Sequence, residues 1–531
     1  MHFSRQLGAQ LQINPLATAS ALLAITALAL FLRLHLLAQD SFWGDELFSV
    51  RRAQSDWDAF WELKRGPVAM ALYYALLRFW ILLGDSEFTI RLLSVIPAVA
   101  TVPLVYLLGK RFFDPRVGLI AALLLALNAF HIQYSQEARS YSLLVLLVTL
   151  SSLFLARGIQ RPSWRNWMGY AVASALSVYA HPFAFLVLVA QVSSLVFLPR
   201  RSLPWNKLCL SGLALAIALL PILAPTASGF IDPDTRADAT SLGWIPEISL
   251  ERVHGFAVDL TGQDGDLLFI AYLIPIFVSG VTAIRTWVSA RASFESWKYA
   301  LLLAWLFLPI IITLGYSLLI APALVSRYLT ICLPPLTLLS AVGILQIYQT
   351  LSIRRGPLPM GAPVISGVLV VALVTLSARG VSTYYTDFAK EDWRGTASHI
   401  MSHWQPGDGI LFYIPSTERM LQHYIKNSEG APEIRPLIPQ GQWRGFLAEE
   451  PDRERIAQYL PDHAGRVWLV MARNHSSPSR TRVTNELHVA LRNKYQDVQK
   501  LYDDGRLIKI FFYSNPVPGV FGGQWEGSAG N

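Results

Sequence analysis

Charged residues and cysteines are both scarce in this sequence. Only 15% of its 531 residues are charged, whereas an ordinary soluble domain carries about 25%. With 53% hydrophobic residues, the composition excludes a disordered chain, a coiled coil and a simple soluble enzyme. The two cysteines, Cys209 and Cys332, lie in apolar runs and form neither a disulfide framework nor a metal-ligand spacing. We expect both to be small buried hydrophobic side chains.

The positive charge of the chain is confined to its apolar part. The formal net charge is +8, but residues 381–531 hold 17 basic and 17 acidic residues. The whole excess therefore lies within residues 1–380, where basic loops orient a protein in the membrane. We expect no nucleic-acid partner.

Apolar runs fill the first 380 residues, and a helix that crosses a bilayer needs about 17–25 of them. We predict eleven membrane spans, of which the third and the sixth are short, near residues 14–37, 88–109, 117–132, 140–156, 166–181, 183–198, 208–226, 266–284, 299–319, 328–350 and 362–379. The first run ends in Arg33 and His35 without a small-residue cleavage pattern. We interpret it as a span rather than a cleaved signal peptide.

One further apolar run, residues 67–83, contains Arg78. The charge of the loops indicates whether this run crosses the membrane. Five short loops hold 14 basic and two acidic residues, namely 110–116, 157–165, 199–207, 285–298 and 353–356. Basic loops stay in the cytoplasm, and these five share that side only if residues 67–83 do not cross. We therefore predict an amphipathic helix at the outer interface. The alternative, a twelfth span, leaves the N-terminus or the five loops on the unexpected side.

The chain is thus predicted to be an all-α polytopic membrane protein with a C-terminal α/β domain. Residues 1–380 form the membrane domain, with a cytoplasmic N-terminus and with residues 38–87 as a first outer loop that carries interfacial helices. Residues 381–531 alternate helix-like stretches (GTASHIMSHW, ERIAQYL, ELHVALRNKY) with strand-like ones (DGILFYI, RVWLVMA). They end in a hairpin, VQKLYDDGRLIKIFFYS, that turns at Asp504-Gly505. We place this domain outside the cytoplasmic membrane.

Charged and polar residues collect at the predicted outer membrane boundary. Placing a charged side chain there costs free energy, so such residues indicate a functional site. The candidate site residues are Asp45, Glu46, Lys64, Arg65, Glu137, Arg139, His181, Arg327 and Tyr328. Arginine and lysine side chains suit a phosphate, and a carboxylate suits the removal of a proton from an attacking hydroxyl or amine. This set predicts a site for an anionic, partly lipidic substrate whose sugar is displaced at the anomeric carbon.

Each of these residues also has a structural interpretation. Asp45-Glu46 can be a solvated helix start, Glu137 and Arg139 a local ion pair, His181 before Pro182 a turn residue, and Arg327 a snorkelling side chain. We interpret Arg33 and His35 as snorkelling groups near the outer end of the first span. The charged segment 231–266 is expected to be a solvated loop, although loops of this length can cover a site.

Several motifs occur in the order known from one family of membrane proteins. They are WGDELFS, GDSEFTIRLLSVIPAVATVPLVYLLGKRFF, GLIAALLLALNAFHIQYSQEARSYSLLVLL, YAHPFAF, SRYLTICLPPLTLL and YYTDFAKEDWRGTASHI. Over residues 20–400 the chain resembles the bacterial relatives of protein O-mannosyltransferases and of lipid A aminoarabinose transferases, which are membrane glycosyltransferases of the GT-C fold.

The resemblance implies a polyprenyl-phosphate-linked sugar as donor and transfer on the outer face of the membrane. Asp45 then matches the general base, with Glu46 as its acidic neighbour, and Glu137 matches an acidic position near the sugar or a metal. Arg327 and Tyr328 would contact the phosphate.

Lys64 and Arg65 lie at the phosphate-proximal position that the family places before the interfacial helix. Relatives read His-Pro-Pro or Lys-Pro-Pro there, whereas this chain reads Lys64-Arg65-Gly66-Pro67. The residues therefore leave open which of the two cations contacts the phosphate. They assign no metal ligands, and the resemblance leaves a divalent metal open.

The residues together with the resemblance predict an inverting membrane glycosyltransferase of the cytoplasmic membrane. Its expected partners are a polyprenyl-phosphate-linked sugar and membrane lipids, with an acceptor that the sequence does not name. The alternative is a polytopic transporter or lipid flippase. That class requires charged groups within mid-membrane spans and repeated halves. The centres of the fourth to seventh predicted spans carry no charge, and no internal repeat is visible.

Overall fold

A computed structural model describes residues 14–57, 70–231, 245–354, 361–388, 390–426, 434–460, 465–472, 478–503 and 507–517. The chain divides into two compact units. The helical unit comprises residues 1–37 and 49–388, and the sheet unit comprises residues 38–48 and 389–531.

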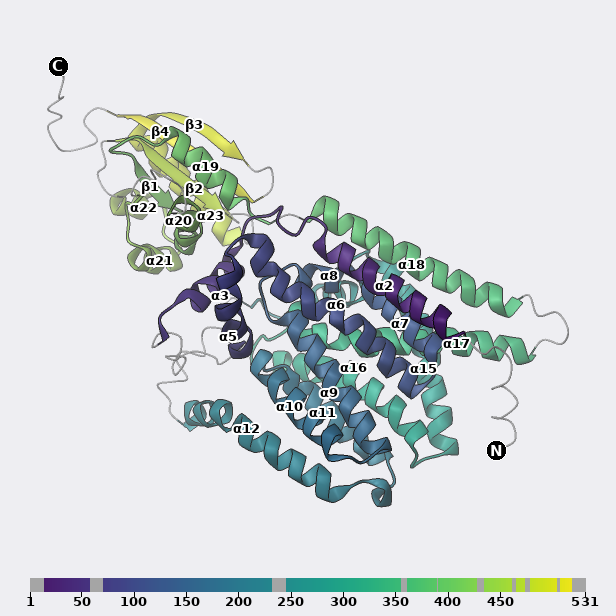
Figure 1. The fold of residues 1–531 in the computed structure, drawn as a ribbon. Helices are drawn as coiled ribbons and strands as arrows, with labels where there is room; N and C mark the ends of the chain where they lie inside the picture. The colour runs from purple at the N-terminus through teal and green to yellow at the C-terminus, as the bar shows by residue number, and fades with distance from the viewer. Residues whose placement is uncertain are drawn as a thin grey trace. The chain divides into compact units, whose positions relative to one another are not determined.

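The helical unit has a helix at the position of every predicted span. They are α2 (Pro15–Leu34), α6 (Glu87–Phe112), α7 (Pro115–Ala126), α9 (Tyr141–Gln160), α10 (Trp164–Ala180), α11 (Ala184–Ser194), α12 (Trp205–Ile231), α15 (Asp266–Ser289), α16 (Phe294–Leu319), α17 (Leu333–Arg354) and α18 (Gly361–Asp387). Figure 1 shows α9, α10 and α11 running alongside one another. Among the described residues, eight helices are long and apolar enough to cross a bilayer, and a bent pair makes a ninth. The polytopic helical fold is confirmed, with α10 and α11 as shorter helices.

The bent pair replaces the third predicted span. Helix α7 ends at Ala126, and α8 (Ala129–Ser135) follows at an angle of 62°. The side chain of Asn128 accepts a hydrogen bond from the backbone N–H of His131 (2.8 Å) and so caps α8. The chain therefore changes direction just before the predicted outer segment that carries Glu137.

The run 67–83 forms a short helix in its described part. Helix α5 (Ala71–Trp80) continues into the three-residue helix η3 (Ile81–Leu83), which Gly84 ends at a φ of 147°. At 1.5 Å per residue this segment reaches about 20 Å, less than the roughly 30 Å of a bilayer core. The structure agrees with a non-spanning helix.

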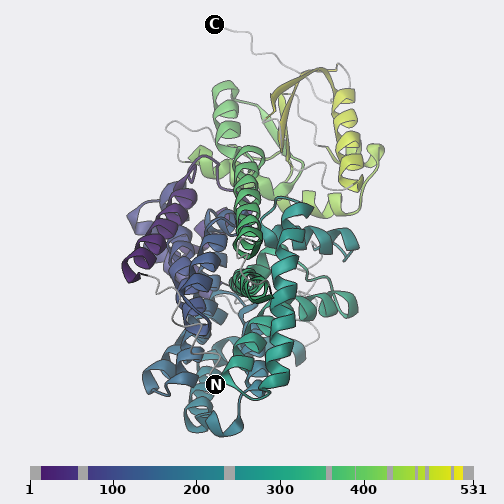
Figure 2. The same ribbon diagram turned by 90° about the vertical axis from the view of Figure 1, so that its right-hand side faces the viewer.

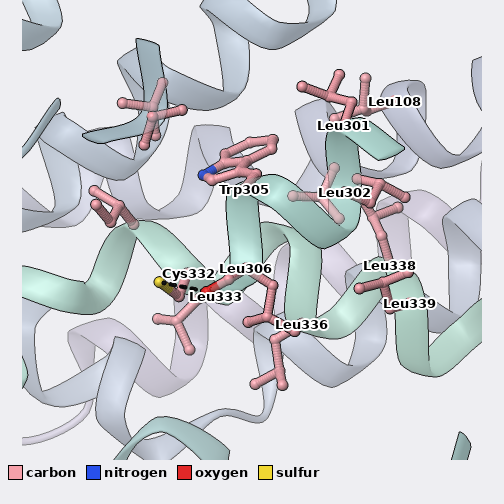
Figure 3. Packing of buried hydrophobic residues seen from close by; sticks show 14 of the residues in the cluster. Leu108, Leu301, Leu302, Trp305, Leu306, Cys332, Leu333, Leu336, Leu338 and Leu339 are labelled. Carbon is pink, nitrogen blue, oxygen red and sulfur yellow. Dashed lines mark hydrogen bonds between the residues drawn. The ribbon is translucent and has the colours of Figure 1, made fainter. Parts of the chain in front are cut away.

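The long helices of the helical unit pack through large apolar side chains and a few glycines. Leu306 of α16 lies beside Leu336 of α17, in a continuous core that also contains Trp305 (Figure 3). Cys332 is buried there and its thiol contacts the carbonyl oxygen of Leu306 at 3.5 Å, as predicted. Cys209 in α12 is exposed, so the prediction of burial is wrong for that residue, which lies on an open face of its helix.

Four further short elements belong to the described part of the helical unit. Helix α14 (Leu250–Thr261) lies in the segment predicted to be a solvated loop, so that prediction is corrected for these residues. The 3-10 helix η7 (Ser326–Cys332) leads into α17. The 3-10 helices η4 (Leu195–Phe197) and η5 (Arg200–Ser202) follow α11.

The sheet unit holds a four-stranded sheet in the order β1-β2-β4-β3. The strands are β1 (Gly409–Phe412), β2 (Val467–Ala472), β3 (Tyr495–Asp503) and β4 (Ile508–Pro516), and the helices are α19 (Trp393–His403), α20 (Glu418–Lys426), α21 (Gln440–Ala448), α22 (Arg453–Tyr459) and α23 (Pro478–Lys494), with η8 (Pro415–Thr417) before α20. β1 and β2 are parallel, and the other pairs are antiparallel. The predicted helices, strands and hairpin are confirmed, while Asp504 and Gly505 lie outside the described residues.

Both faces of this sheet are covered. Alternate residues of β2 belong to two different apolar clusters, with Leu469 on one side and Trp468 and Val470 on the other. Figure 2 shows helices on both sides of the strands. A strand buried on both faces reads as a continuous apolar run, which is why RVWLVMA was recognisable.

The segment 38–48 is part of the sheet unit, although it is far from it in sequence. Ser41 donates to the carbonyl oxygen of Glu391 (2.6 Å) and accepts from the N–H of Trp393 (2.9 Å). The N–H of Phe42 donates to the hydroxyl of Tyr424 (2.6 Å). These bonds fix the backbone that leads into helix α3 (Gly44–Gln54), whose first turn carries Asp45 and Glu46.

Candidate active site

Asp45 and Glu46 occupy the first turn of α3, where the helix dipole favours carboxylates. Glu46 forms an ion pair with Lys390 at 3.1 Å, and the two side chains are only 0% and 6% exposed. Its carboxylate also accepts from the N–H of Trp43 at 3.4 Å. Asp45 is half-buried. Glu46 thus anchors the start of α3 within the sheet unit, one residue away from the predicted base.

In the helical unit, Glu137 and Arg139 lie in the short segment between α8 and α9, and both are buried. The guanidinium of Arg139 donates to the hydroxyl oxygens of Tyr74 (3.3 Å) and Ser49 (3.4 Å). The hydroxyl of Ser94 donates to the carbonyl oxygen of Arg139 (3.1 Å). The segment is therefore held by three separate parts of the chain.

Aromatic rings connect this segment to the other predicted residues. The guanidinium of Arg139 lies 5.9 Å from the ring of Tyr141, and Tyr141 lies 6.0 Å from His181. The ring of His181 is 4.8 Å from Tyr328, over which the guanidinium of Arg327 lies at 5.5 Å. Arg139 and Arg327 both act electrostatically on His181. Five predicted residues, from three distant parts of the sequence, therefore belong to one cluster.

Beside this cluster the helical unit has a cavity of 350 Å³. Its lining includes Ser326 and Arg327 of η7, Arg252 and Asp259 of α14, and Tyr134 of α8. The charges of Glu137, Arg327 and Asp259 all reach the hydroxyl of Tyr134. The cavity thus adjoins the cluster and combines two cations, Arg252 and Arg327, with one carboxyl group, that of Asp259.

Arg252 and Asp259 are functional candidates that the sequence analysis missed. The guanidinium of Arg252 donates to the carbonyl oxygen of Leu324 at 3.3 Å. Burial raises the pKa of Asp259, and hydrogen bonds from Ser326 and Gln263 counteract part of that rise. The signal was the amphipathic stretch SLERVHGFAVDLTG, which begins with the capping serine Ser249.

Arg33 is wrongly predicted as a snorkelling side chain. It is 0% exposed, and its guanidinium donates to the carbonyl oxygens of Ala29 (3.0 Å), Ala126 (3.2 Å) and Leu125 (3.3 Å). It also contacts Nδ1 of His131 at 2.7 Å. Because two of these carbonyls end α7, Arg33 stabilises the break between α7 and α8. His35 is exposed, as expected.

Two predicted residues and the metal remain to be placed. Lys64 and Arg65 lie outside the described residues. No group of three or more histidine, cysteine, aspartate or glutamate side chains within the described ranges is arranged to hold a metal ion. We derive no chemical step through a metal.

Comparisons with known proteins agree with this architecture. Residues 67–226 match the family described as dolichyl-phosphate-mannose-protein mannosyltransferase. A search of curated proteins by sequence gave no match.

Three solved structures share the fold. ArnT from Cupriavidus metallidurans bound to undecaprenyl phosphate superposes with a TM-score of 0.56 at 14% identity, over 94% of this chain and 99% of that chain. The oligosaccharyltransferase of Archaeoglobus fulgidus with zinc and sulfate gives 0.54 at 13% identity, over 93% and 73%. AglB from the same organism, with an inhibitory peptide and a dolichol-phosphate, gives 0.54 at 12% identity, over 96% and 75%. The resemblance expected from the motifs is confirmed: the chain has the fold of the GT-C membrane glycosyltransferases and, over residues 67–226, the sequence pattern of their mannosyltransferase family.

Proposed function

We propose that this protein transfers a sugar from a polyprenyl-phosphate donor to an acceptor at the outer face of the cytoplasmic membrane, with inversion at the anomeric carbon. The observation that carries the proposal is the cavity of 350 Å³ in the helical unit, which Arg327 lines beside the cluster of Glu137, Arg139 and His181. A half-buried arginine that lines a cavity is suited to a phosphate.

In the proposed reaction, Arg327 holds the donor phosphate together with Lys64 or Arg65. Asp45 accepts the proton of the acceptor hydroxyl or amine, and the acceptor atom then bonds to the anomeric carbon. The bond from that carbon to the phosphate oxygen breaks on the opposite face, and its electron pair leaves with the phosphate. The guanidinium of Arg327 stabilises the negative charge that develops there.

The remaining residues have supporting roles in this proposal. Glu137 lies near the transferred sugar. His181 and Tyr328 form the aromatic contact that orients Arg327. Glu46 is assigned a positioning role, because its buried ion pair with Lys390 fixes the turn that carries Asp45.

The charge of the loops supports the orientation. We propose a cytoplasmic N-terminus and an extracytoplasmic sheet unit, so that the five basic loops remain in the cytoplasm. The sheet unit carries Asp45 in its first segment, and it is therefore proposed to help select the acceptor.

The direct test is transfer from a labelled polyprenyl-phosphate sugar by purified protein. We expect Asp45→Asn to lower turnover at least about 100-fold, the range that a general base contributes. Asp56→Asn, which removes an exposed carboxylate from the same part of the chain, is the matched control and should turn over normally. Near-normal turnover by folded Asp45→Asn protein contradicts the assigned base. Movement of an intact sugar-lipid across the bilayer, without transfer, would favour the flippase.

A further inference from the structure

Helix α14 presents one stripe of residues to the cavity. Arg252, Gly255, Phe256 and Asp259 all line it, and their spacing of three, four and seven residues places them on one face of an α-helix. Arg252 and Asp259 are two turns apart, which is about 10 Å along the helix axis. The cavity thus has a cation at one end of this wall and a carboxyl group at the other.

The same helix is tied at both ends to the segment that carries Leu324 and Ser326. Arg252 donates to the carbonyl oxygen of Leu324 (3.3 Å), and Asp259 is hydrogen-bonded to Ser326. Ser326 directly precedes Arg327. Polar contacts therefore fix the position of α14 against this segment, and the side chains between those contacts determine what fits in the cavity.

Gly255 leaves the middle of the wall open. A Cβ atom built on Gly255 meets nothing within 4 Å, although a glycine inside a helix costs about 1 kcal/mol relative to alanine. The Nε–H of Arg252 is buried and has no hydrogen-bond partner among the described residues. Leaving a buried hydrogen-bond donor without an acceptor costs free energy. A ligand in the cavity can supply the missing acceptor.

We propose that α14 is the second recognition wall for the donor headgroup: Arg252 binds the phosphate together with Arg327, Asp259 accepts hydrogen bonds from the transferred sugar, and Gly255 provides room for the sugar ring. This assignment rests on the proposed function. It adds the residues that choose the sugar, which neither the motifs nor the comparisons assign. At 350 Å³ the cavity falls within the range of small-ligand pockets, about 300–1,000 Å³.

The pair of arginines also has a role in the chemistry. The donor is a phosphodiester with one negative charge, and the leaving group is a phosphate monoester that gains a second. Two guanidinium groups stabilise that second charge better than one. Arg252 should therefore matter more for binding the sugar-free lipid phosphate than for binding the donor.

The test compares binding of undecaprenyl phosphate with turnover of undecaprenyl-phosphate-linked hexoses and aminosugars, using the full-length purified protein. We expect Arg252→Gln to weaken undecaprenyl phosphate binding about tenfold or more. Asp259→Asn should leave that binding unchanged, but alter the preference between hexose and aminosugar donors. Gly255→Leu should abolish turnover of the sugar donors with little effect on the lipid phosphate, and Gly255→Ala should give a smaller effect in the same direction.

Matched controls separate these effects from damage to the fold. Gly280→Leu in α15 introduces the same side chain where a Cβ also meets nothing within 4 Å. Arg285→Gln removes an exposed arginine from the same helix. Both should behave like the unaltered protein. If the α14 variants also behave like the unaltered protein, while Arg327→Gln loses lipid phosphate binding, the proposed role of α14 is overturned and the proposed function stands. If the unaltered protein neither binds undecaprenyl phosphate nor consumes any of the donors, the proposed function itself fails.

Discussion

Single buried charges carry much of the organisation of this protein. The guanidinium of Arg33 donates hydrogen bonds to two carbonyl oxygens at the end of α7. The sequence could not show this, because these carbonyls are available as acceptors only where α7 ends. Asp45, Glu137, Arg139 and Arg327 could be proposed from position alone, since charges beside apolar runs are rare. Arg252 and Asp259 were missed because a charged helix between spans reads like a solvated loop.

The ion pair between Glu46 and Lys390 gives a prediction about stability. Glu46→Gln leaves the Lys390 ammonium buried without its carboxylate, and we expect it to destabilise the sheet unit by about 3–5 kcal/mol. Replacing both residues, Glu46→Gln with Lys390→Met, should cost less than Glu46→Gln alone, because no unpaired charge remains. Hydrogen exchange of α19 and α20 in the full-length protein measures both. Equal protection in the unaltered and Glu46→Gln proteins contradicts an anchoring role for the pair.

At the scale of elements, helix positions were predictable and helix breaks were not. Eleven apolar runs located eleven helices, because the bilayer demands long apolar segments. The bend between α7 and α8 depends on Asn128 and on the contacts of Arg33, neither of which interrupts the apolar pattern. In the sheet unit, period-two and period-3.6 patterns located each predicted strand and helix.

Helices α15 and α17 pack so closely at Gly343 that no larger side chain fits there without a shift of the two helices. A Cβ on Gly343 would lie 1.9 Å from the carbonyl oxygen of Pro275, so Gly343→Ala must push the two helices apart. We expect a loss of about 2–3 kcal/mol of stability, seen as a lower midpoint of thermal unfolding in detergent. Gly280→Ala, made on the open face of α15, should instead be neutral or stabilise by up to about 1 kcal/mol. A Gly343→Ala protein as stable as the unaltered one would contradict this packing.

The stability of the sheet unit should depend on pH through His488 of α23. Burial, and secondarily Arg492, lowers the pKa of His488 below its ordinary value of about 6.5. The unfolded state therefore binds this proton more readily than the folded state, and stability falls as the pH drops below about 6.5. Above that value the group contributes no further change.

Hydrogen exchange of α23 and β4 at pH 7.5 and 5.5 measures this effect. After the observed rates are divided by the intrinsic exchange rates at each pH, we expect lower protection factors at pH 5.5, and a smaller difference in a His488→Gln variant. His399, whose pKa is lowered by burial and by His403, titrates in the same direction, so His399→Gln serves as the second arm. Exchange that is equally pH-dependent with both histidines replaced would show that other groups are responsible.

For the whole molecule, the distribution of charge predicts orientation. The five basic loops should face the cytoplasm, and the sheet unit should face the other side. In a background with Cys209→Ser, we expect Ser402→Cys in the sheet unit to react with a membrane-impermeant maleimide in right-side-out vesicles. Ser202→Cys, in the basic loop 199–207, should react only after the vesicles are opened. The reverse labelling pattern would invert the topology and remove the outer-face reaction.

The discontinuous sheet unit has a consequence for biosynthesis. Glu46 leaves the ribosome early, but its partner Lys390 lies 344 residues later. At about 5–20 residues per second, translation needs on the order of tens of seconds to cover that interval. Helices can insert into the membrane throughout this time, while the segment that carries Asp45 still lacks the strands and helices that hold it. A chain released early would therefore contain the spans while the segment of the proposed base is not yet held in place, and the proposed activity would arise only when synthesis is nearly finished.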